Sequence, residues 1–164
     1  MKKIVAVALV IIAIVVAADL YKKYRIAPIL KFETLALIDL NGNTVRLQDY
    51  HDKKIFLNFF QTWCGPCIAE FPALDNVAET LSSDNFIFIS ISDEPLPLLN
   101  KVQAHFNPRH LLILHSVKPL KDLQIVTYPT SYLLNAKREV VLEKTGSEDW
   151  AQPGITGLLK QKAE

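Results

Sequence analysis

Cys64 and Cys67 are the only two cysteines of this 164-residue chain, and two residues separate them. A short apolar run at 55–60 precedes the pair, and apolar residues spaced mostly by three and four follow it as far as Leu81. This pattern predicts a buried strand that turns into a helix, with Cys64 at the helix N-terminus. A Cys-x-x-Cys pair between such elements indicates a dithiol redox site.

The position of Cys64 at the start of the helix predicts that it is the reactive thiol. Unpaired N–H groups and the positive end of the helix dipole stabilise a thiolate there. Cys67 lies one turn further, near enough for a disulfide but partly shielded by the first turn. Pro66 suits this turn, because the N–H that it lacks would have no partner there anyway. We therefore predict that Cys64 attacks and that Cys67 resolves.

The motif at 63–67 resembles the active site of the thioredoxin superfamily. Pro72 stands where thioredoxins kink the helix after the cysteines, and the segment 128–130 resembles their cis-proline loop. In that superfamily the loop faces the disulfide and docks the substrate chain in extended form. The resemblance implies these substrate-binding residues: Trp63, Gly65, Pro66, Tyr128, Pro129 and Thr130.

Further features resemble the membrane-anchored TlpA/ResA branch of that superfamily. They are a leading hairpin within 34–45, Glu70 shortly after the cysteines, and Gly146 followed by Asp149-Trp150. The similarity covers roughly residues 32–159. It implies a thioredoxin-like domain at 32–164.

Asn58 stands six residues before Cys64, where cytosolic thioredoxins carry a buried aspartate that helps to deprotonate the resolving cysteine. The TlpA/ResA branch commonly has asparagine there and uses a glutamate that corresponds to Glu70. Partial burial near two sulfurs would raise the pKa of this carboxyl group and let it relay a proton. The spacing alone also allows a solvated glutamate on the helix surface. The resemblance favours a catalytic Glu70 beside Cys64 and Cys67.

The rest of the chain alternates strand and helix patterns, which predicts an α/β fold with a mixed sheet. We expect a thioredoxin fold with helices flanking the sheet, an N-terminal β-hairpin across Asn41-Gly42, and a central strand-and-helix insert at about 93–126. The expected strands are 35–39, 44–47, 54–60, 86–91, 111–114, 131–134 and 139–142. The expected helices are one that follows the cysteine motif and ends at about Leu81, one at 96–106 and one at roughly 150–160, with a helical turn at 121–126.

A hydrophobic segment precedes this domain. Fifteen apolar residues at 4–18 lie between basic flanks, fewer than the roughly 20 of a spanning helix and at the upper limit of the roughly 7–15 of a signal peptide. We predict a signal-anchor or transmembrane segment at 1–25 and a linker at 26–31. The alternative is cleavage near Ala18 and secretion. In either case we expect the domain to lie outside the cytoplasm.

Export determines what the cysteine pair can do. Outside the cytoplasm a Cys-x-x-Cys pair stays oxidised unless electrons are supplied. We therefore expect a membrane-anchored, extracytoplasmic thiol–disulfide oxidoreductase that reduces disulfides of exported proteins, such as apocytochrome c, and takes electrons from a membrane donor. The alternatives are an oxidase or isomerase of the same fold, and a binding or metal-carrier module without turnover. No cofactor is expected.

Composition and motifs argue against other classes of function. The net charge is +1 and no basic stripe is visible, so we expect no nucleic-acid partner. His105, His110 and His115 could in principle complete a zinc site with the two cysteines, but the distance along the chain is far longer than in compact zinc modules. We expect no metal. The chain has no G-x-S-x-G motif and no phosphate-binding loop.

Overall fold

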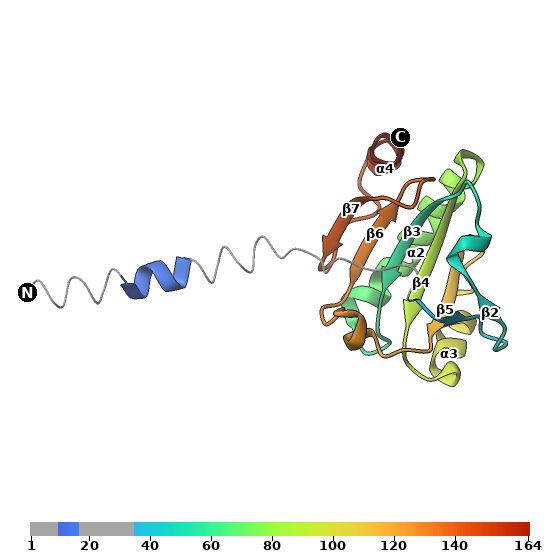
Figure 1. The fold of residues 1–164 in the computed structure, drawn as a ribbon, viewed down its shortest axis with the longest axis horizontal. Helices are drawn as coiled ribbons and strands as arrows, with labels where there is room; N and C mark the ends of the chain where they lie inside the picture. The colour runs from blue at the N-terminus through green and yellow to red at the C-terminus, as the bar shows by residue number, and fades with distance from the viewer. Residues whose placement is uncertain (1–9, 17–34) are drawn as a thin grey trace, which may run out of the picture.

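The computed structural model describes residues 10–16 and 35–164 (Figure 1). Residues 10–16 form a short helix inside the predicted segment 1–25, whose other residues lie outside the described parts, as does the predicted linker 26–31. Among the described residues, no helix has the length and apolar character needed to cross a membrane. The anchor therefore stays a prediction.

Within residues 35–164, seven strands form one mixed sheet in the order β2-β1-β5-β4-β3-β6-β7 (Figure 1). The strands are β1 Leu37–Ile38, β2 Thr44–Val45, β3 Lys54–Phe59, β4 Phe86–Ser92, β5 Leu111–Ser116, β6 Thr130–Leu134 and β7 Val140–Thr145. The central strands β3, β4 and β5 are parallel, and the others pair antiparallel. The predicted mixed sheet is confirmed, with the hairpin β1–β2 at one end.

Helices cover one face of this sheet. They are α2 Gly65–Leu81, α3 Leu96–Phe106 and α4 Ile155–Ala163, and buried residues of all three share one apolar cluster with Phe56, Phe88 and Leu133 of the sheet. Alternate strand residues, such as Leu57 and Ile89, form a second cluster on the opposite face. Short 3₁₀ helices contribute to that face: η2 Leu47–Asp49 and η4 Leu120–Leu123.

The central elements agree with the sequence prediction, and the last helix differs. α3 has the predicted bounds, whereas α4 begins at Ile155 rather than near Trp150. Gly154 is the N-cap of α4 and has a φ of 87°, in the left-handed region that glycine adopts readily. The residues between Trp150 and Gly154 form turns instead of helix.

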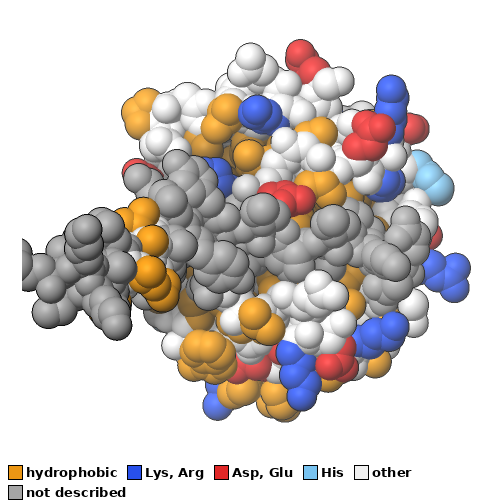
Figure 2. All heavy atoms as spheres, turned by 60° about the vertical axis from the view of Figure 1, so that its left-hand side comes forward, with side chains coloured by type: hydrophobic (Ala, Val, Ile, Leu, Met, Phe, Trp, Pro, Cys, Tyr) orange, Lys and Arg blue, Asp and Glu red, His pale blue; other side chains and the backbone are white. Residues whose placement is uncertain are grey.

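The surface carries no dominant charge on the side shown in Figure 2. Lysine and arginine side chains of the described residues are interspersed there with aspartate and glutamate. Such mixing creates only weak long-range fields.

Candidate active site

Cys64 and Cys67 form a disulfide at the start of α2, with an S–S distance of 2.04 Å. Cys64 is the N-cap, and its Sγ accepts a hydrogen bond from the Cys67 backbone N–H over 3.3 Å. After reduction the same N–H group and the helix dipole would stabilise a thiolate at Cys64. Cys64 keeps 7% exposure, whereas Cys67 has none. This geometry fits attack by Cys64 and resolution by Cys67.

A turn at residues 61–64 connects β3 to the disulfide. The Cys64 N–H donates to the Gln61 carbonyl over 3.1 Å and closes the turn. Gln61 donates its side-chain amide to Asp93 over 2.6 Å, and Thr62 donates both its backbone N–H and its hydroxyl to Glu94. Two carboxylates that follow β4 therefore hold this turn.

The sequence analysis placed Asp93 and Glu94 only at the start of the insert 93–126 and missed these contacts. One signal could have found them: both follow an apolar run typical of a buried parallel strand. The carboxyl ends of neighbouring parallel strands meet at one edge of a sheet. Because β3 and β4 are neighbours, their following residues lie beside one another.

The predicted cis-proline loop lies against the same turn. The Tyr128–Pro129 peptide bond is cis, as the resemblance implied. The Tyr128 ring meets Trp63 edge to face at 5.9 Å between centroids. Trp63 is 72% exposed, so most of its indole is available to a partner. Thr130 donates its hydroxyl to the Thr127 carbonyl over 2.7 Å and braces the loop.

The nearby carboxylates also affect the pKa of the Tyr128 phenol. Burial is the main cause that raises its pKa, and the charges of Asp93 and Glu94 raise it further against a hydrogen bond with Gln61. The cis-proline loop, the turn at 61–64 and the two carboxylates therefore form one neighbourhood. Gly65 and Pro66, the other predicted contacts, are exposed at the first turn of α2.

Glu70 is buried, with 5% exposure, which rules out the solvated alternative. Its Oε1 accepts hydrogen bonds from the Ser147 hydroxyl over 2.9 Å and from the Glu148 N–H over 2.7 Å. Burial raises the pKa of Glu70, while the hydrogen bonds from the Glu148 N–H and the Ser147 hydroxyl oppose this shift. Glu70 lies one turn after Cys67 on α2, a spacing that places the two side chains on one face of the helix.

Asn58 is fully buried in β3 and is hydrogen-bonded to its neighbours. Its Nδ2 donates to the Ser131 hydroxyl over 3.1 Å, and the Ser90 hydroxyl faces its Oδ1 at 3.5 Å. These three residues occupy one row across β4, β3 and β6. The amide completes a neutral polar row, whose three side chains do not carry a carboxyl group.

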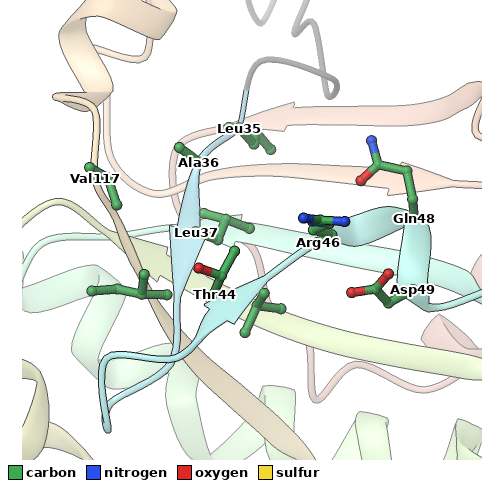
Figure 3. A pocket seen from close by; sticks show the side chains of 10 residues that line it. Leu35, Ala36, Leu37, Thr44, Arg46, Gln48, Asp49 and Val117 are labelled. Atoms are coloured by element: carbon green, nitrogen blue, oxygen red, sulfur yellow. The ribbon is translucent and has the colours of Figure 1, made fainter.

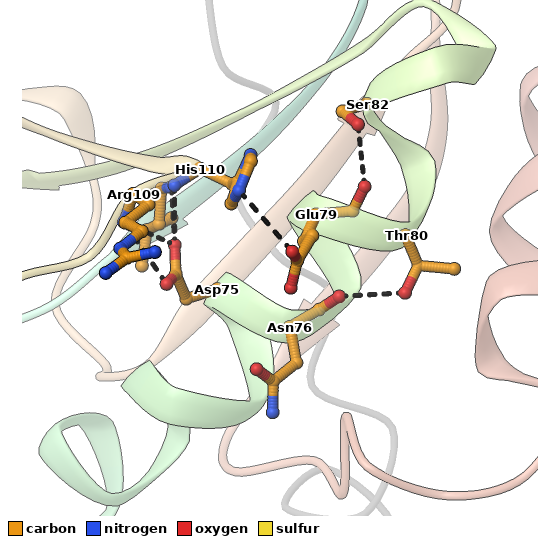
Figure 4. Close-up of polar contacts among 8 residues, drawn as sticks. Asp75, Asn76, Glu79, Thr80, Ser82, Arg109 and His110 are labelled. Atoms are coloured by element: carbon orange, nitrogen blue, oxygen red, sulfur yellow. Dashed lines mark hydrogen bonds and ion pairs between the residues drawn. The ribbon is translucent and has the colours of Figure 1, made fainter.

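Two of the histidines contact acidic residues of other segments. His110 approaches Glu79 at 3.9 Å on the surface (Figure 4), and His115 places Nδ1 3.0 Å from the Glu94 carbonyl. In the described part of the chain, no group of three or more histidine, cysteine, aspartate or glutamate residues is arranged to hold a metal.

A hollow of about 500 Å³ lies beside the hairpin β1–β2 (Figure 3). Leu37, Thr44, Arg46 and Val117 line it among others, and no residue of the disulfide site does. Beside the disulfide, the exposed indole of Trp63 contacts the ring of Tyr128.

Comparisons with known proteins agree with this geometry. The model of the Redoxin family matches residues 25–159. The thiol-disulfide oxidoreductase ResA of Bacillus subtilis is 29% identical over 114 residues, which cover 68% of this chain and 63% of ResA. The thioredoxin-like protein YneN of the same organism is 31% identical over 106 residues, or 62% of each chain. The chain thus spans somewhat less than two thirds of these relatives' length.

A solved structure shares the fold. The exposed lipoprotein thioredoxin of Streptococcus pneumoniae superimposes with a TM-score of 0.65 at 22% sequence identity. The match covers 77% of this chain and 97% of that one. The mixed sheet with a disulfide at the start of α2 is therefore the thioredoxin fold.

Proposed function

Since the chain belongs to the Redoxin family and is a TlpA/ResA-type member of the thioredoxin superfamily, we propose that it is a thiol–disulfide oxidoreductase. The observation that carries the proposal is the Cys64–Cys67 disulfide, whose first sulfur occupies the N-cap of α2. A helix N-terminus stabilises the thiolate that thiol–disulfide exchange requires.

In the proposed reaction, the Cys64 thiolate attacks one sulfur of a substrate disulfide. A mixed disulfide forms, and the other substrate sulfur leaves as a thiolate that takes up a proton. Cys67 then loses its proton, which Glu70 accepts directly or through solvent, and attacks the Cys64 sulfur. The substrate leaves with two thiols, and the enzyme is left with the Cys64–Cys67 disulfide that the structure contains.

We place substrate binding on the surface around the disulfide. The exposed indole of Trp63 and the ring of Tyr128 supply apolar contacts, and the Gly65–Pro66 segment leaves the sulfurs approachable. Thr130 begins β6 and Pro129 directly precedes it, and an extended peptide would dock there beside the cis bond. Disulfide-bonded exported proteins, including apocytochrome c, are the proposed substrates.

We further propose that the domain works outside the cytoplasm. The apolar run at 4–18 supports export, as an anchor within 1–25 or as a signal cleaved near Ala18. The linker 26–31 would then lead to the domain 32–164. An exported reductant needs electrons from a membrane donor, because its surroundings favour the disulfide.

The reduction potential of the Cys64–Cys67 couple tests the direction of the reaction. We expect a value near that of thioredoxin, roughly −270 mV, measured by equilibration of the purified chain with glutathione or dithiothreitol. A value near about −120 mV, as in DsbA, would make the protein an oxidant. The absence of a reversible couple would favour a binding or metal-carrier module and would overturn the proposal.

A further inference from the structure

Glu94 binds both hydrogen-bond donors of Thr62, one residue before Trp63 and two before Cys64. The Thr62 hydroxyl donates to Oε1 over 2.8 Å, and the Thr62 backbone N–H donates to Oε2. Thr62 and Trp63 are the central residues of the turn that the Cys64 N–H closes on Gln61. One carboxylate thus fixes the middle of the turn that ends in the nucleophile.

The carboxylate is itself fixed by the strands behind it. The Glu94 N–H donates to the Ser92 hydroxyl over 3.2 Å, and the Glu94 carbonyl lies 3.0 Å from His115 Nδ1. Ser92 ends β4 and His115 belongs to β5, so Glu94 is held by two parallel strands. A side chain that is braced in this way can hold a loop in one conformation.

Asp93 binds Gln61, the first residue of the same turn. Its Oδ1 accepts from the Gln61 amide over 2.6 Å, and its Oδ2 accepts from the Leu120 N–H over 2.8 Å. Among the ion pairs of residues 35–164, none includes Asp93 or Glu94. Both carboxylates therefore serve as hydrogen-bond acceptors for neighbouring segments, not as partners of a cation.

Reduction makes these contacts more important. In the oxidised protein, the disulfide ties Cys64 covalently to α2. Once that bond is broken, the turn at 61–64 and the helix N-cap help to determine where the Cys64 sulfur points, together with the apolar cluster that Cys64 belongs to. A small misplacement of a reacting atom can slow a reaction considerably.

We propose that Glu94 is a positioning residue for thiol–disulfide exchange: by holding Thr62 it fixes the turn that presents Cys64 and Trp63 to the substrate. This inference rests on the proposed function. Glu94 touches neither sulfur in the contacts above, so its effect is transmitted through Thr62.

The test compares three variants of the reduced full chain: Glu94→Ala, Glu94→Gln and, as a matched control, Asp75→Ala. The Asp75 carboxylate also accepts hydrogen bonds from backbone N–H groups, those of residues 109–111. These residues lie at the start of β5, at the edge of the parallel strands opposite to the turn at 61–64. The measurement is the second-order rate constant for reduction of insulin disulfides, at a temperature where all variants are folded. Circular dichroism checks the folding of each variant.

We expect Glu94→Ala to lower this rate constant by at least about 10-fold, because the turn loses its central acceptor. Glu94→Gln should recover most of the loss, since an amide oxygen still accepts from the Thr62 N–H. Asp75→Ala should stay within about 2-fold of the wild type, because the site is untouched.

Several results would overturn the inference: a wild-type rate in Glu94→Ala, an equal loss in Asp75→Ala, or no recovery in Glu94→Gln. Failure of the proposed function looks different. In that case the reduced wild-type chain itself would leave insulin disulfides intact.

Discussion

Ser147 donates its hydroxyl to Oε1 of Glu70 over 2.9 Å and so joins the loop before α4 to the buried face of α2. Ser147 is exposed, whereas the Glu70 side chain is almost fully buried. The carboxyl group is therefore one hydrogen bond away from a solvent-accessible hydroxyl. This link gives a buried acid a short route for exchanging its proton with water.

Glu70→Gln should change the pH dependence of stability in the oxidised protein. Burial raises the folded-state pKa of Glu70 above its ordinary value of 4.5. The folded state therefore binds the proton more tightly, and the wild type loses stability as the pH rises from 4.5 through the raised pKa. The variant cannot titrate there. Urea denaturation at several pH values should show the free energy of unfolding of the wild type falling relative to the variant across this window.

Ser147→Ala is the control for that titration. It removes a hydrogen bond that favours the ionised carboxylate, so the pKa of Glu70 should rise further. The pH window in which wild-type stability declines should extend upward in this variant. Identical pH profiles for the wild type, Ser147→Ala and Glu70→Gln would show that Glu70 does not titrate in the folded protein.

Cys67→Ser should trap substrates. Cys64 remains free to attack, but the resolving thiol is lost, so mixed disulfides with Cys64 accumulate. Turnover should fall by at least about 100-fold, because resolution then depends on an external thiol. Non-reducing electrophoresis with mass spectrometry of the adducts measures this. Cys64→Ser is the matched control, and adducts that formed only in that variant would reverse the assigned roles, whereas equal adducts would show that either thiol can attack.

The order of the elements could be predicted from the sequence because burial patterns are local. The apolar runs at 55–60 and 86–91 mark strands covered on both faces, and α3 was predicted with its observed bounds. The start of α4 was misplaced because it depends on the positive φ of Gly154. A sequence pattern does not show in which conformation a glycine is held.

The site was predictable only where a motif or a resemblance marked it. Cys64 and Cys67 were assigned from spacing, and the cis bond before Pro129 from resemblance. Glu94 had no such mark, because its role depends on the pairing of β3 with β4 and on a contact between residues 32 positions apart. Contacts of this kind are created by topology, which local patterns do not encode.

Trp63→Ala should impair the binding of polypeptide substrates more than the chemistry. The indole is 72% exposed and contacts Tyr128 edge to face, so its removal should change stability by less than about 0.5 kcal/mol. We expect the KM for insulin to rise about 10-fold, since exposed aromatic residues often dominate an interface. The rate with a small aromatic disulfide should change little. An equal loss with both substrates would instead place Trp63 in the positioning of Cys64.

Asp75→Ala should destabilise the fold and leave the redox site intact. Its carboxylate accepts N–H groups from Arg109, His110 and Leu111 and so joins α2 to the start of β5 (Figure 4). Hydrogen bonds to a charged group contribute about 1.5–3 kcal/mol, so we expect a loss of about 2 kcal/mol in the free energy of unfolding. Urea denaturation should show a lower midpoint with an unchanged slope.

Asp84→Ala is the control for the loss of unfolding free energy in Asp75→Ala. Like Asp75, Asp84 links a helix to a neighbouring segment through its carboxylate. Its partner is Lys160 at 2.7 Å, in an ion pair that is partly exposed to water. Exposed pairs contribute about 0–1 kcal/mol, so this variant should lose less stability than Asp75→Ala. Equal losses would mean that the three backbone N–H groups bind water as well as they bind Asp75. In both variants the reduction potential should stay at the wild-type value, since neither carboxylate contacts the turn at 61–64.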